Sequence, residues 1–219
     1  MTDRASAGSH PDTRGYHAVH NTFRLATTRY VDATRKLEPS ALRPIIGSRW
    51  EFYAAVLHHH HHTEDDSIFP ALLALRPDLQ PLVDKLEDDH RRLVTVMDAV
   101  GVAVAAFEDQ PDAGHQKTVH DAIASVRDLF FPHLDIEDAQ ILPELAESMP
   151  PKEYDRLDQE ALRSIPRPYL PNAVGALDEV IRGLPKEEQP PPPPLPIRFM
   201  LAVSWRRKWT EWIKPLLVS

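Results

Sequence analysis

A chain of 219 residues is long enough to bury a hydrophobic core, as one domain or as one domain with an appendage. It has no cysteine, which excludes disulfides, thiolate nucleophiles, iron–sulfur clusters and cysteine-based zinc sites. Its formal charge of −8 disfavours general nucleic-acid binding, which needs a basic surface.

The N-terminal segment is polar and lacks the apolar stretch of a signal peptide. No apolar run reaches the roughly 18 residues that are needed to span a bilayer. We therefore expect a flexible N-terminus over residues 1–15, no transmembrane segment and a cytoplasmic protein.

Helical spacing of apolar side chains predicts a first helix over residues 16–37, with His20 on its inner face. Pro39 and Pro44 predict a turn after it. The inner face of the second predicted helix carries Ile46, Trp50, Tyr53, Leu57, His60 and Glu64. Pro70 should bend or end this helix, because proline lacks a backbone donor and clashes with the preceding turn.

The third helix is expected to begin near Asp78 and the fourth after Gly114. Their inner faces carry Leu82, Leu86, His90, Leu93, Met97, Val100 and Val104 on the third, and Val119, Ile123, Val126, Phe130, His133 and Glu137 on the fourth. Pro132 predicts a kink in the fourth helix, and Pro143 should act as Pro70 does. Four helices with short connections predict an all-α fold, an antiparallel four-helix bundle over residues 16–147.

The second and fourth helices end in the same pattern, offset by 73 residues. The matching pairs are His60 and His133, Glu64 and Glu137, Asp65 and Asp138, Ile68 and Ile141, Pro70 and Pro143, and Leu72 and Leu145. The five consecutive histidines of residues 58–62 therefore belong to a structural repeat and are not a purification tag. The repeat predicts two helical hairpins related by a pseudo-twofold axis.

The inner faces bring imidazoles and carboxylates together at the centre of the predicted bundle. The candidate metal ligands are His20, His60, Glu64, His90, His133 and Glu137. A charged carboxylate in a bundle core costs several kcal/mol unless something compensates it. Residues four apart on a helix point the same way, so each His-x-x-x-Glu pair can grip one ion while its glutamate reaches a second. Imidazole and carboxylate ligands without thiolate favour two iron ions over manganese or zinc.

The ligand count leaves room at such a centre. Two six-coordinate ions need about twelve ligand positions, of which these residues fill about eight. The remainder would be an oxo or hydroxo bridge, water or a small molecule. Such a site is open to O2, H2O2 or NO.

These residues resemble the hemerythrin-like, or HHE cation-binding, family. The family pattern is a lone His, then HHxxED followed by an apolar pair and Pro, then a lone His, then HxxxE. Here these are His20, the stretch from His60 to Pro70, His90, and the pair His133 and Glu137. The resemblance covers about residues 16–147. It implies a non-haem di-iron centre in a four-helix bundle, in proteins that bind dioxygen reversibly, sense oxygen or iron, or react with peroxide or nitric oxide.

The third helix departs from the oxygen-carrying members of that family. They have a His-x-x-x-His pair there, whereas the positions four residues from His90 are Leu86 and Val94. Glu87 is an alternative ligand, in an ExxH arrangement like that of ferritin-type di-iron proteins, or else part of a solvated acidic face. The altered ligand set favours reactive chemistry of a catalase or peroxidase kind over reversible oxygen storage.

The remaining histidines of the run have the same spacing to acidic residues as His60 has. The apolar register and the repeat both select His60, so we place His59, His61 and His62 at the surface or beside the ligands.

Three further side chains are candidates for a supporting role around the metals. Tyr53, two turns before His60, is interpreted as packing, with a hydrogen bond to a bound oxygen species as the alternative. Asp65 and Asp138 are expected to orient ligand histidines or to hold the connecting turn.

The C-terminal third is expected to be a short helical extension over 148–188, a polyproline linker over 189–196 and an amphipathic helix over 197–219. The apolar stripe of that last helix is Ile197, Met200, Leu201, Trp205, Trp209, Trp212, Ile213 and Leu216. Basic residues flank the stripe. The helix docks on its own bundle or on a second copy in a homodimer, lies on a membrane surface, or fills a partner's groove.

Three functions stay open on the sequence. The first is a di-iron redox enzyme that acts on peroxide or a related small oxidant. The second is a module that binds or senses O2, NO or iron without turnover. The third is a structural metal site, such as a zinc site.

Overall fold

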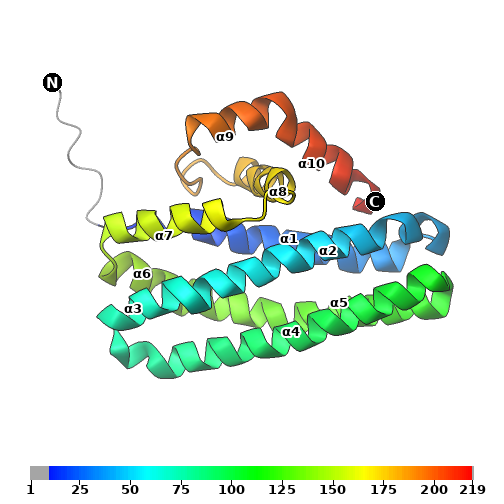
Figure 1. Cartoon of the computed structure of the whole chain (residues 1–219), viewed down its shortest axis with the longest axis horizontal. Coiled ribbons are helices and arrows are strands. Elements are labelled where there is room, and N and C mark those ends of the chain that lie inside the picture. Colours follow the sequence, from blue (N-terminus) through cyan, green and yellow to red (C-terminus); the bar gives the residue numbers. More distant parts are fainter. Residues whose placement is uncertain (1–9, 219) are drawn as a thin grey trace.

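The computed structural model describes residues 10–218 of the chain, which fold into helices throughout (Figure 1). Residues 1–9 lie outside the described residues. Most of the segment that was expected to be a flexible N-terminus without a signal peptide falls there. Four long helices pack antiparallel: α1 (Arg14–Lys36), α2 (Pro39–Thr63), α4 (Gln80–Asp109) and α5 (Ala113–Ile136). Helix α5 packs on α1 and α4, and α4 also packs on α2. The predicted four-helix bundle is confirmed.

Both ligand-bearing hairpins end in the same departure from regular helix. Helix α2 runs into a π-helical turn, η1 (Glu64–Ile68), and then α3 (Phe69–Leu75). Helix α5 runs into a second π turn, η3 (Glu137–Ile141), and then α6 (Leu142–Ser148). The chain therefore stays helical through Pro70 and Pro143, where the sequence predicts a bend or an end. Each proline stands at the start of a new helix, where its missing N–H costs least.

The two earlier prolines also correct an expectation. Pro39 occupies the start of α2 and Pro44 lies inside that helix, so they do not bracket a turn. The fixed φ of proline suits the first helical position, and the reversal of the chain falls at the extended residues Leu37 and Glu38. A short 3₁₀ turn, η2 (Pro77–Leu79), leads into α4, and α5 continues through Pro132.

A buried polar layer divides the hydrophobic core in two. On one side lie apolar side chains such as Phe23, Leu57, Leu93 and Phe130. On the other lie Tyr16, Ile68, Leu86 and Ile141. Helices α1 and α4 contribute to both sides, whereas the chains of α2 and α5 reach the second side through the segments that follow them, η1 with α3 and η3 with α6. The ligand histidine of each long helix falls between the two sides. The helical register thus places all the predicted ligands in one layer.

The C-terminal third packs on one side of the bundle (Figure 1). It consists of α7 (Pro151–Ser164), α8 (Leu170–Gly183), α9 (Leu195–Met200), a π turn η4 (Leu201–Trp205), α10 (Arg206–Ile213) and a 3₁₀ turn η5 (Lys214–Leu216). Trp209, Ile213 and Leu216 are buried in the same apolar cluster as the bundle core. The structure thus shows the last segment docked on its own bundle.

A polar network ties this extension to the bundle. Arg29 of α1 makes two hydrogen bonds to the carboxylate of Glu179 on α8, at 2.7 and 2.9 Å. The indole N–H of Trp209 donates to the same carboxylate at 2.7 Å. Between residues 10 and 218, no helix is long and apolar enough to cross a membrane.

Candidate metal centre

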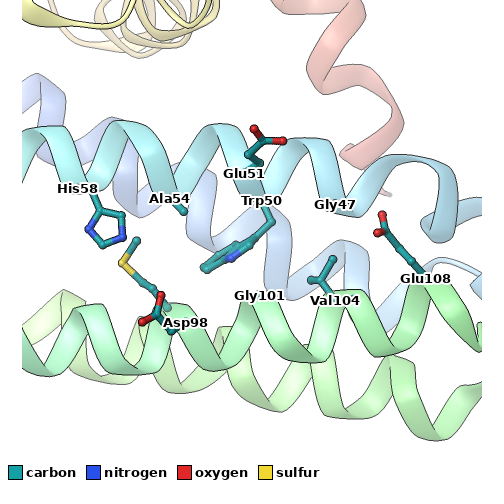
Figure 2. A pocket seen from close by; sticks show the side chains of 11 residues that line it. Gly47, Trp50, Glu51, Ala54, His58, Asp98, Gly101, Val104 and Glu108 are labelled. Carbon is teal, nitrogen blue, oxygen red and sulfur yellow. The ribbon is translucent and has the colours of Figure 1, made fainter.

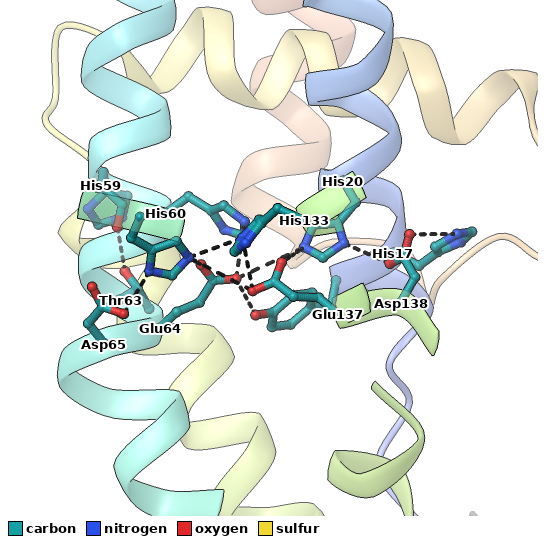
Figure 3. A network of polar contacts seen from close by, with 12 residues as sticks. His17, His20, His59, His60, Thr63, Glu64, Asp65, His133, Glu137 and Asp138 are labelled. Carbon is teal, nitrogen blue, oxygen red and sulfur yellow. Dashed lines mark hydrogen bonds and ion pairs between the residues drawn. The ribbon is translucent and has the colours of Figure 1, made fainter. Parts of the chain in front are cut away.

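The structure brings the six predicted ligands into one layer at the middle of the bundle (Figure 3). Each of the four long helices supplies a histidine, and the two glutamates are the first residues of the two π turns. Apart from the half-buried His60, all of them are buried. A charged or polar layer at this depth requires compensation.

The donor atoms form two groups. In each group, all the donor atoms lie within 4.8 Å of one another. Cluster A consists of His20, His60, Glu64 and Glu137, and cluster B consists of His61, His90 and His133. Imidazole and carboxylate groups at such distances are suited to hold transition-metal ions.

Glu64 faces both clusters with different oxygens. Its Oε1 lies 3.1 Å from Nε2 of His60 in cluster A. Its Oε2 lies 3.6 Å from Nε2 of His90 in cluster B.

Glu137 does the same from the opposite helix. Its Oε2 lies 3.4 Å from Nε2 of His20 in cluster A, and its Oε1 lies 3.3 Å from Nε2 of His133 in cluster B. Two carboxylates that each direct one oxygen to each cluster have the arrangement that bridges a pair of metal ions.

Two aspartates fix the orientation of the histidines that come from α1 and α4. Nδ1 of His20 lies 2.7 Å from Oδ1 of Asp138 (Figure 3). Nδ1 of His90 lies 2.7 Å from Oδ1 of Asp65. With Nδ1 engaged, Nε2 of each ring faces the centre of the layer. Carboxylates commonly orient ligand imidazoles in this way, which is the role expected of Asp65 and Asp138. Arg24 in turn holds Asp138 at 2.8 Å.

Many inward-facing polar atoms of this layer have no hydrogen-bond partner. Among the described residues, the buried unpaired atoms of the layer are His20 Nε2, His60 Nε2, both ring nitrogens of His61, Glu64 Oε2, His133 Nδ1 and both carboxylate oxygens of Glu137. Native proteins rarely bury so many unpaired polar atoms, because each one costs free energy of desolvation. Metal ions would satisfy the nitrogens and oxygens that face the centre, so the residues present fit such ions.

The environment sets the protonation of the histidines. Burial lowers the pKa of His60 to about 3 and that of His61 well below its ordinary value. Burial also disfavours the charged form of His20, but its contacts with Asp138 and Glu64 outweigh this and raise its pKa to about 9. Without metal, His60 and His61 are therefore neutral and ready to ligate, whereas His20 must first lose a proton.

The carboxylate of Glu137 stays ionised in spite of its depth. Burial acts to raise its pKa, but the charge and hydrogen bond of His133, together with the charges of His20 and His90, bring the pKa below its ordinary value. An ionised carboxylate is the form that binds a cation.

Of the two places predicted for His61, the surface and a position beside the ligands, the structure shows the second. Its side chain is only 4% exposed and stacks on His90 with ring centroids 4.1 Å apart. Its counterpart in the repeat is Leu134, which is also buried. Leu134 could have indicated the burial of His61 from the sequence, because an apolar residue at the equivalent position of the second copy suggests that the position faces the core.

Tyr16 is a further residue of the centre that the sequence analysis missed. Its hydroxyl donates a hydrogen bond to Oε1 of Glu64, and its ring centroid lies 4.9 Å from that of His20. Burial and the charge of Glu64 raise the pKa of this phenol well above its ordinary value. Tyr16 lies one turn before His20, and the equivalent position before His90 is the buried Leu86, so its inward direction was also present in the repeat.

The remaining candidates lie away from the centre. Tyr53 bonds through its hydroxyl to Thr27 at 2.6 Å and packs among aromatic rings, so packing is its role. Glu87 is half-buried and belongs to neither cluster, because the inward position on that turn of α4 is Leu86. His59 bonds to the backbone oxygen of Ala161 at 3.0 Å, away from both clusters.

Comparison with known proteins agrees with this geometry. Residues 13–160 match the family described as hemerythrin HHE cation binding domain. Neither the comparison with curated proteins nor that with solved structures found a match. The match covers well over half of the chain and includes every residue of clusters A and B, so the chain belongs to the hemerythrin HHE cation-binding family.

Proposed function

We propose that this protein holds two iron ions and uses them to react with hydrogen peroxide or another small oxidant. His20 and His60 hold one ion and His90 and His133 the other, with His61 as a further ligand of the second. The observation that carries the proposal is the pair of glutamates, each with one oxygen toward cluster A and the other toward cluster B. Iron would supply the electrons for the reaction.

The protein's own residues would exclude water, orient the ligands and hold a proton beside the centre. Asp65 and Asp138 hold two imidazoles so that their Nε2 atoms face the centre. Tyr16 holds a proton on its hydroxyl, next to Oε1 of Glu64. The raised pKa keeps this proton on Tyr16, where it serves as a hydrogen bond to the carboxylate that faces both clusters.

An alternative is a module that binds O2, NO or iron without turnover and reports its occupancy. Helix α1 favours this alternative because it carries Tyr16 and His20 at the centre and also Arg29, which holds Glu179 of the extension. A change at the metals that moved α1 would reach the C-terminal helices.

Elemental analysis of untagged protein tests the proposal directly. We expect two irons per chain and an absorption spectrum that changes on addition of hydrogen peroxide, with oxygen evolved or reductant consumed. Two irons without turnover would favour the alternative. One zinc ion, or no metal, would contradict both.

Substitution separates the centre from the rest of the histidine run. The double change Glu64→Ala and Glu137→Ala should abolish the binding of two metals, because it removes both bridging carboxylates. His59→Ala is the matched control on the same run, and it should leave two metals bound.

A further inference from the structure

The metal centre uses only part of the histidine run. His60 and His61 belong to the clusters, and His59 bonds to Ala161. His58 and His62 remain. Both are exposed, and they lie four residues apart on α2, so their side chains emerge on the same face one turn apart.

These two histidines line a pocket whose inner residues are part of the metal centre. His59 also lines it, but its Nε2 is engaged by the backbone oxygen of Ala161. The pocket has a volume of about 410 Å³ and lies between α2 and α4. His61 and His90 of cluster B also line it. His61 is the group of interest, because it is 4% exposed and neither of its ring nitrogens has a partner. The pocket thus connects an exposed pair of imidazoles with a buried, unpaired one.

A second pocket lies along the same seam between α2 and α4 and shares His58 with the first (Figure 2). Its lining includes the carboxylates of Glu51, Asp98 and Glu108. Carboxylates that line a concave surface raise the local concentration of cations. The charge of this seam therefore favours the approach of a cation to His58.

The first pocket is lined by one basic side chain, Arg91, and by one carboxylate, Asp65, and a second carboxylate, Asp66, stands beside its rim. Arg91 lines it, but its guanidinium pairs with Asp88 at 3.3 Å. On the other rim, Nε2 of His62 lies 3.0 Å from Oδ2 of Asp66, which adds a carboxylate beside the exposed histidines.

We propose that His58 and His62 form a capture site for divalent transition-metal ions, from which an ion passes through the pocket to His61 and into the buried centre. Two imidazoles one turn apart suit such ions, and exposed side chains exchange them readily. The site takes part in loading and is not part of the occupied centre. It rests on the proposed metal centre as its destination.

Cobalt(II) is a suitable probe, because its visible absorption reports binding and it is not oxidised during the measurement. Metal-free full-length chain is mixed with cobalt(II) in a stopped-flow instrument, and the number of ions bound is measured at equilibrium. The variant is the double change His58→Ala and His62→Ala, and His59→Ala is the control from the same run. All three positions lie outside clusters A and B.

We expect the double variant to fill the buried centre at least about tenfold more slowly than the wild type, as loss of local ion concentration implies. It should still reach two cobalt ions per chain, and His59→Ala should load like the wild type. The wild type should also bind one additional, weaker ion that the double variant lacks.

Equal loading rates for the wild type and the double variant would overturn the capture site while leaving the metal centre intact. Binding of no cobalt by the wild type would overturn both the centre and its loading route. A further change, Arg91→Gln, should speed loading because it removes the opposing charge from the rim of the pocket.

Discussion

At the scale of single residues, the centre depends on imidazoles that are neutral before a metal arrives. Burial makes the charged forms of His60 and His61 costly; neither ring nitrogen of His61 has a hydrogen-bond partner, and the nearby charge of Glu64 only partly offsets the burial of His60. A neutral imidazole without partners is itself unfavourable in a core. Part of the metal-binding free energy therefore comes from relief of a cost that the metal-free fold already bears.

His61 offers a sharp test of this view, because the chain itself contains the alternative residue at the equivalent position. His61→Leu should preserve packing, since Leu134 is fully buried in the second copy. Metal affinity at cluster B should fall by about 10- to 100-fold or more, the loss seen even for residues that only support ligands. The metal-free protein should become equally or more stable, because two unpaired nitrogens are removed.

Metal titration and thermal unfolding of the same samples measure both effects. His59→Leu is the control and should leave metal affinity unchanged. An unchanged affinity in His61→Leu would show that His61 only packs against His90.

At the scale of elements, the π turns determine where the chain goes after each ligand glutamate. In each turn the amide that follows donates five residues back, from Phe69 to the oxygen of Glu64 and from Leu142 to that of Glu137. A π turn inserts one residue into the helical register, and such turns are frequent at functional sites. The insertion lets the glutamate face the metals while the next helix still buries its apolar side.

Insertion of one alanine after Ser67 should therefore destabilise the protein. The π turn already accommodates one extra residue, and a second one would rotate the chain after it by about 100°. Phe69 and Leu72, which are fully buried, would turn away from the core. We expect a loss of about 3 kcal/mol or more in the free energy of unfolding of the metal-free chain, measured by denaturant titration.

The substitution Ser67→Ala keeps the length of the chain and is the matched control. It should change stability by no more than about 0.5 kcal/mol. Equal stability of the insertion and the substitution would show that the register of α3 does not depend on the length of the π turn.

The sequence predicted those elements that show a regular spacing of apolar residues. Apolar spacing located the bundle helices, because each of them buries one continuous stripe. It could not reveal the π turns, since an inserted residue looks like a local break in the pattern, and Pro70 and Pro143 then suggest a bend or an end. The burial of a histidine is also hard to predict, because an imidazole is compatible with surface and core alike. For His61, only the comparison with the equivalent Leu134 indicated a buried position.

At the scale of the whole molecule, the extension and the bundle share one apolar core. Trp209 is 5% exposed and belongs to the same cluster as Phe130 of α5. Its indole also completes the carboxylate network between Arg29 and Glu179. This shared core buries Trp209, Ile213 and Leu216 of the C-terminal stripe, and it favours unfolding of the bundle and extension as one unit.

The protonation of the centre should also appear in the stability of the whole metal-free chain, with a maximum near pH 6.5. Below that pH the unfolded chain takes up a proton at His60 that the fold excludes, because burial lowers the pKa of His60 to about 3. Stability therefore falls as the pH falls. Above that pH the fold keeps a proton on His20, whose pKa is about 9, which the unfolded chain has lost, so stability falls again as the pH rises.

Denaturant unfolding at pH 5, 6.5 and 8.5, with and without metal, measures this dependence. Each group contributes a slope of about 1.4 kcal/mol per pH unit over its range. Asp138→Asn should flatten the alkaline side, because it removes the first contact that raises the pKa of His20. Bound metal should also abolish the alkaline loss, since it has already displaced that proton. A stability that rises steadily from pH 6.5 to 8.5 in the metal-free chain would show that His20 is neutral there and that Asp138 serves only to orient it.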